Sequence, residues 1–150
     1  MRLLTQREQR QDTGVLERAK TDDDVATSPL FRLGRVLFGV VLAFNAVDNL
    51  RNLEERIAFA ESKDAPKPRL SVPAISGGLL FGGVGIALWR VPTAAAAAVA
   101  GFLVGVTPLM HDFWNVDDPE EKQNQLFHFL KNGALLGAAL AFLHVGRRER

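Results

Sequence analysis

The chain has 150 residues, a net charge of +1 and no cysteine. This length fits one domain, and the balanced charge provides no global electrostatic field to attract nucleic acid or an acidic partner. Without cysteine there are no disulfides, thiol redox chemistry or thiolate metal sites, and the three histidines are the strongest nitrogen ligands. Between residues 70 and 110 the only charged residue is Arg90. Such segregation of charge is typical of lipid-facing helices joined by polar loops.

Residues 1–29 are polar and contain no apolar core of signal-peptide length. We expect them to form a largely disordered cytoplasmic tail that can include a short surface helix. The first predicted span, residues 30–50, has an uncharged stretch, VLFGVVLAFNAV, that is short for crossing a bilayer. Arg32 and Arg35 can extend this span if their head groups reach the membrane surface.

The second and third predicted spans carry no charge and have the length that a bilayer requires, about 20 residues. They are LSVPAISGGLLFGGVGIAL, residues 70–88, and VPTAAAAAVAGFLVGVTPLM, residues 91–110. The short join Arg90–Val91–Pro92 predicts a tight antiparallel hairpin, with Pro92 in the first helical turn.

The fourth predicted span, residues 126–145, reads LFHFLKNGALLGAALAFLHV. Its helix should begin earlier, at Pro119, because Asp118 can cap it and Glu121 follows three residues later. Residues 147–150 form a basic tail. The fold class predicted is therefore all-α, a four-helix transmembrane bundle with antiparallel up-down-up-down order, over residues 30–146.

Two further patterns concern packing and orientation. Each of three spans has two glycines four residues apart, a spacing that permits close helix approach in lipid. These pairs are Gly78 and Gly82, Gly101 and Gly105, and Gly133 and Gly137.

The positive charges indicate an orientation in the membrane. If the N-terminus lies inside the cell, eleven Lys and Arg residues are on the inner side, counting Arg32 and Arg35, and seven are on the outer side. This bias predicts a multi-pass protein of the cell membrane with both termini cytoplasmic.

Polar residues should converge at the outer surface, where the first and third helices end and the fourth begins. Asn45, Asp48, Asn49 and Asn52 share one face of the first helix. The candidates for a polar cluster or ligand site are Asn45, Asp48, His111, Asp112, Trp114, His128, Lys131 and Asn132. Lys131 lies within an apolar stretch and needs a partner; Asp48 is the first candidate and Asp112 the second.

Three interpretations of this cluster stay open. The residues can simply anchor the bundle in the headgroup layer, with Trp114 in an aromatic belt. They can line an outward-opening cavity for a small polar, quinone-like ligand. His111 and His128 can also bind a metal together with a carboxylate, although they show no specific ligand spacing. No triad, phosphate loop or haem motif is present, so no catalytic residue and no metal ligand is assigned.

Three stretches carry a resemblance: LGRVLFGVVLAFNAVDNL, AESKDAPKPRLSVPAISGGLLFGGVGIAL and MHDFWNVDDPEEKQNQLFHFLKN. Within the last, HDFW followed by FHFLKN is similar to the HxFW…HFLKN pattern of the DoxX-like membrane proteins, and the resemblance runs from about Leu30 to Val145. It implies a four-span prokaryotic membrane protein. Some relatives are linked to thiosulfate-to-quinone oxidation or to membrane oxidoreductase complexes. The family has no agreed catalytic residues to transfer, and the charged segment before Leu30 departs from many relatives.

The function expected is that of a subunit or accessory of a quinone-linked membrane redox system, without independent catalytic activity. The histidines would exchange protons with a quinone oxygen or bond to it. The alternative is a non-catalytic assembly factor that binds partner helices, or a second copy, through its glycine faces. A small carrier is a third interpretation, disfavoured because no inverted repeat is evident.

Overall fold

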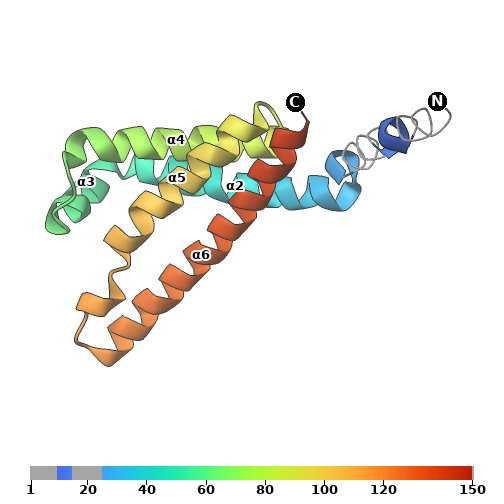
Figure 1. The fold of residues 1–150 in the computed structure, drawn as a ribbon. Helices are drawn as coiled ribbons and strands as arrows, with labels where there is room; N and C mark the ends of the chain where they lie inside the picture. Colours follow the sequence, from blue (N-terminus) through green and yellow to red (C-terminus); the bar gives the residue numbers. More distant parts are fainter. Residues whose placement is uncertain (1–9, 15–24, 150) are drawn as a thin grey trace.

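The computed structural model describes residues 10–14 and 25–149, which are helical apart from their connections (Figure 1). The helices in order are α2 (Pro29–Arg51), α3 (Leu53–Ser62), α4 (Pro68–Leu88), α5 (Pro92–Met110), the 3₁₀ helix η1 (Phe113–Asn115) and α6 (Pro119–Arg148). Residues 10–14 form a short helix. The prediction of a largely disordered tail allowed for a short surface helix, and for residues 1–9 and 15–24 it lies outside the described residues.

The four long helices, α2, α4, α5 and α6, are long and apolar enough to cross a membrane. Large apolar side chains lie on their outer faces; Phe44 is 73% exposed and Leu130 is 56% exposed. Lipid is the environment in which such surfaces are stable, whereas in water they would drive aggregation. The chain is a multi-pass membrane protein, and the predicted all-α antiparallel fold is confirmed.

Local sequence signals set the helix ends. Each long helix begins with proline in its first turn, where the missing N–H has no helical partner in any case. Asp118 caps α6 by accepting a hydrogen bond from the Glu121 N–H at 2.9 Å, as predicted. The turn between α4 and α5 is tight because Trp89 and Val91 take left-handed conformations, with φ of 56° and 47°.

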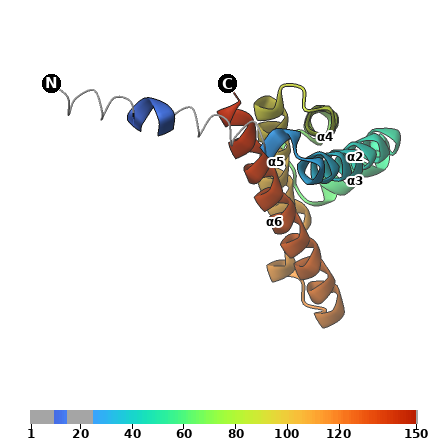
Figure 2. The same cartoon turned by 90° about the vertical axis from the view of Figure 1, so that its right-hand side faces the viewer.

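The long helices form two antiparallel pairs, α2 with α4 and α5 with α6, and α4 also packs on α5. Figures 1 and 2 show the pairs meeting beside the α4–α5 turn and diverging toward the other end. We call the first end the closed end and the second the open end. This arrangement places the ends of α2 and α5 and the start of α6 at the open end, the end that the sequence predicts to be polar.

At the closed end, side chains from different helices fix the pairs to each other. The Arg35 guanidinium of α2 donates hydrogen bonds to the carbonyls of Ile86 and Ala87, at the end of α4, and lies 5.7 Å from the Trp89 ring. The Trp89 indole in turn donates to Glu149 at 2.6 Å. Arg35 thus adds a donor to carbonyls in the last turn of α4, where the Ile86 carbonyl also accepts from the Trp89 N–H.

The glycines that permit close packing differ from most of those predicted. A Cβ at Gly39 of α2 would lie 2.7 Å from the Ala87 nitrogen, and one at Gly83 of α4 would lie 2.7 Å from the Gly39 oxygen. Gly82 fits the prediction, since its Cβ would lie 2.6 Å from a Val99 methyl group. The prediction is wrong within the described chain for the remaining five, whose Cβ positions have no atom within 4 Å: Gly78, Gly101, Gly105, Gly133 and Gly137. The reason is that the i, i+4 spacing identifies a face without identifying what packs on it.

The connection between α2 and α4 contains α3, a helix that was not predicted between the first two spans. Its buried residues, Ile57 and Ala60, pack with Val72 of α4, and Leu53 and Met110 border this cluster. In the sequence, Ile57 and Ala60 stand among charged residues, so this short apolar face of α3 was not recognised. Helix α3 therefore covers the open end of α4 and brings new side chains to the predicted polar cluster.

Candidate ligand-binding site

A cavity of about 290 Å³ lies between the diverging helix pairs at the open end, and we call it the central cavity. Its lining includes residues from α2, α3, α4, α5 and α6. Apolar side chains such as Leu42, Leu79 and Leu103 form most of its wall. The polar side chains that line it are Asn45, Asn49, Arg56, Ser76, His111 and Asn132. Hydrogen-bonding groups from four helices and from the residue after α5 therefore surround one apolar space.

Arg56 of α3 is the cationic group in this lining. Its Nη2 donates to the Asp48 carboxylate of α2 at 2.9 Å. The Nε of the same guanidinium is buried and has no hydrogen-bond partner among the described residues. An unsatisfied buried donor costs free energy.

His111 lies at the junction of α5 and η1, and its ring stacks on His128 of α6 with centroids 5.1 Å apart and planes 14° apart. Its Nδ1 is 2.8 Å from the Gln125 side-chain oxygen. An amide oxygen only accepts, so Nδ1 is the donor, and the Nε2 of the neutral ring is left as an acceptor. Protonation would convert Nε2 into a donor, so His111 can both accept and return a proton.

Lys131 has a different environment from the one predicted. Its side chain is exposed and its ammonium lies 3.3 Å from His128 Nδ1. Asp48 is paired with Arg56, and Asp112 accepts from the Lys63 ammonium at 2.7 Å. The predicted pairing of Lys131 with Asp48 or Asp112 is therefore corrected. Both carboxylates pair with cations from α3, a helix that was not predicted, and from the residue that follows it.

The remaining predicted residues fall into two groups. Asn132 donates to the Thr107 hydroxyl at 3.2 Å and lines the cavity with Asn45. Trp114 is 49% exposed and packs edge-on against Phe113 and Phe129, outside the cavity. Of the eight candidates, the structure brings Asn45, His111 and Asn132 to the cavity lining, and their function stays a prediction.

Some residues at this site were not singled out from the sequence. Asn49 had been noted only as a member of the polar face of α2. Arg56, Lys63 and Ser76 were missed, because Arg56 and Lys63 stand among charges expected in a wet loop and a serine in a glycine-rich span is common. Within the described chain, no group of three or more His, Cys, Asp or Glu side chains is placed to hold a metal ion.

The fold and site define a class: a four-span helical membrane protein with a polar-lined cavity between two antiparallel helix pairs. Comparison with protein families gives a match to DoxX over residues 30–112. This match covers more than half of the chain, so the chain belongs to the DoxX family, which confirms the resemblance. The match includes α2 to α5 and ends at Asp112, before α6. Neither the curated proteins nor the solved structures contain a match to the chain.

Proposed function

We propose that this DoxX protein binds a quinone headgroup in the central cavity and serves as a subunit or accessory of a quinone-linked membrane redox system. One observation carries the proposal: hydrogen-bonding side chains converge on a largely apolar cavity inside a membrane protein. Ligand pockets commonly combine an apolar wall with a few polar groups that fix orientation. A quinone ring has the matching character, with apolar faces and two carbonyl oxygens.

The lining residues fit such a headgroup. Arg56 and Asn49 both line the cavity, and their side chains carry N–H donors that suit a carbonyl oxygen. A quinone supplies two-electron, two-proton chemistry when bound. The chain's own part would be to hold the ring and to exchange a proton at His111 Nε2. As an accessory, the protein would leave electron delivery to a partner subunit.

Binding of a decyl benzoquinone to the purified protein tests this proposal. Arg56→Met and Asn49→Leu should each weaken binding about tenfold, because each removes a donor to a ligand oxygen. Asn124→Leu is the matched control, since Asn124 is exposed on α6 and lies outside the cavity. The proposal fails if the wild-type protein shows no saturable binding, or if the control weakens binding equally.

A second candidate function is assembly of membrane complexes through α6. Gly133 and Gly137 are exposed on this helix, and their Cβ positions have no atom within 4 Å. A partner helix could approach closely there. Gly137→Leu should then release a co-purifying membrane protein while quinone binding stays unchanged. Retention of that partner would count against this second function.

A further inference from the structure

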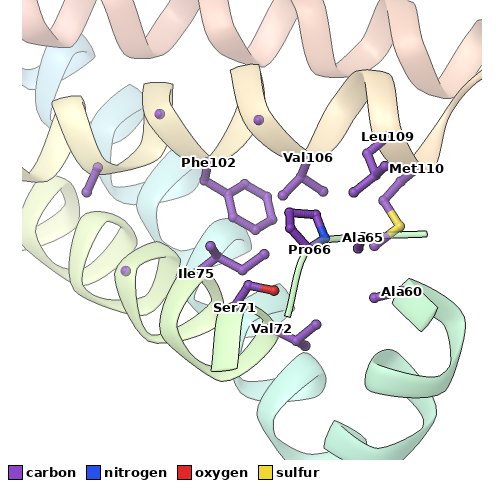
Figure 3. Close-up of a pocket in the computed structure, with 14 residues that line it drawn as sticks. Ala60, Ala65, Pro66, Ser71, Val72, Ile75, Phe102, Val106, Leu109 and Met110 are labelled. Atoms are coloured by element: carbon purple, nitrogen blue, oxygen red, sulfur yellow. The ribbon is translucent and has the colours of Figure 1, made fainter. Parts of the chain in front are cut away.

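A second pocket, of about 440 Å³, lies beside the central cavity and is almost wholly apolar. It is bordered by α4, α5, the end of α3 and the α3–α4 connection. Figure 3 shows Pro66 of that connection facing Phe102 and Val106 of α5 across the pocket. Among its lining side chains only Ser71 carries a hydroxyl, and none is charged. We call this space the side pocket.

Glycines contribute much of the room in the side pocket. Gly78 of α4 and both Gly101 and Gly105 of α5 line it, and their Cβ positions have no atom within 4 Å. These are three of the glycines that do not serve helix packing within the chain. Larger side chains at these positions would therefore take up space in the pocket.

The side pocket and the central cavity are neighbours with a shared wall. Five residues line both spaces, namely Val72, Ile75, Phe102, Val106 and Met110. One layer of side chains therefore separates an apolar space from a space with polar groups. Small side-chain rearrangements, common at binding surfaces, would connect the two.

The sizes of the two spaces suggest a division of roles. Pockets for whole small molecules measure about 300–1,000 Å³, and the central cavity, at about 290 Å³, falls at the lower limit. It has room for a headgroup but not for a long tail as well. The Lys63–Asp112 ion pair joins the α3–α4 connection to the end of α5 and helps to hold this wall of the side pocket in place.

We infer that the side pocket holds the apolar tail of the quinone whose headgroup occupies the central cavity, an inference that rests on the proposed function. The occupant matches the lining: a hydrocarbon chain for the apolar side pocket and a hydrogen-bond acceptor for the polar cavity. A tail in a bilayer is already among hydrocarbon, so the pocket contributes room and close packing rather than removal from water.

Two probes separate tail binding from headgroup binding: a methoxylated benzoquinone without a tail, and its decyl derivative. Gly78→Leu and Gly105→Leu fill the side pocket and should weaken binding of the decyl compound about tenfold or more, the effect of overfilling a packed space. Affinity for the tail-free ring should stay at the wild-type value. Gly77→Leu is the matched control, because Gly77 adjoins Gly78, is exposed and does not line the pocket.

Retained binding of the tail-free ring also shows that a variant is folded. Gly105→Ala is a smaller change for the case in which leucine prevents folding, and it should weaken decyl binding to a lesser degree. Detergent takes up the decyl compound more strongly than the tail-free ring, but it does so to the same degree for every variant. The ratio of the two dissociation constants is therefore compared between each variant and the wild type.

The outcomes distinguish the inference from the proposed function. If the wild-type protein binds both probes and no glycine variant changes the ratio, the tail lies elsewhere and only the inference fails. If the wild-type protein binds neither probe, both fail. Labelling of side-pocket residues by a phospholipid with a photoreactive acyl chain, in the presence of saturating decyl quinone, would show that a lipid occupies the pocket and would also overturn the inference.

Discussion

Ionic side chains at both ends of this protein make contacts that join separate segments of the chain. Arg35 bonds to the last carbonyls of α4, Arg56 of α3 pairs with Asp48 of α2, and Lys63 pairs with Asp112 beyond α5. The last pair is the least exposed of the ion pairs among the described residues, with 27% and 19% of the side-chain surface exposed. Exposed pairs contribute little to stability, so the Lys63–Asp112 pair is the one whose loss should be measurable.

Two double-mutant cycles test this assignment. Lys63→Met and Asp112→Asn should be non-additive in their effects on thermal stability in detergent, because they remove the two halves of one interaction. Lys131→Met and Asp48→Asn should be additive, since these groups have other neighbours. Coupling between Lys131 and Asp48, with none between Lys63 and Asp112, would contradict the described arrangement.

The sequence indicated that Asp48, Asp112 and Lys131 lie at one end of the bundle, but it could not predict how they pair. Position along a helix follows from residue number, whereas pairing depends on which helix faces reach each other and on α3. The same applies to the cavity. Asn45, His111 and Asn132 were predicted as candidates, whereas Arg56 was not, because it lies on α3 and that helix was not predicted.

At the scale of the elements, the pairing of α2 with α4 depends on glycines that allow backbone contact. The Gly39 Cα faces the backbone of Gly83 and Ala87, and no side chain larger than hydrogen fits between them. In lipid such contacts replace the hydrophobic effect as a source of helix association. The pair should therefore be sensitive to a single added methyl group.

Gly39→Ala should destabilise the protein by about 1–3 kcal/mol, the usual cost of forcing extra atoms into a packed interface. Gly34→Ala on the same helix is the control, because its Cβ position is open. The control should be neutral or stabilising by up to about 1 kcal/mol, since alanine favours the helix over glycine. Denaturation of both variants in detergent measures the difference, and equal stabilities would show that α2 and α4 do not meet at Gly39.

The bounds of the long helices were predictable to within a few residues because their signals are local: prolines at the starts, the Asp118 cap and unbroken apolar stretches. The helix contacts were not predictable in the same way. Gly78 and Gly101 have the spacing of packing glycines yet face open space, while Gly39 lacked that signal and is buried. Contact depends on crossing geometry, which glycine spacing alone does not determine.

At the scale of the whole molecule, two helix pairs join at a closed end and diverge at an open end (Figures 1 and 2). The divergence leaves room for the central cavity, and the tight α4–α5 turn keeps the pairs together. We propose that the open end faces outward and that both termini are cytoplasmic, on the basis of the positive-charge bias. A ligand would then reach the cavity from the outer half of the bilayer.

Single-cysteine labelling can show whether the open end lies at the outer surface, because the chain has no cysteine of its own. Ser62→Cys, at the end of α3, and Asn115→Cys, in η1, report on the two connections of the open end. Gln11→Cys reports on the N-terminal segment. An impermeant maleimide applied to intact cells should label Ser62→Cys and Asn115→Cys and should label Gln11→Cys only after the membrane is permeabilised. Labelling of Gln11→Cys in intact cells, or protection of both open-end cysteines, would contradict this account.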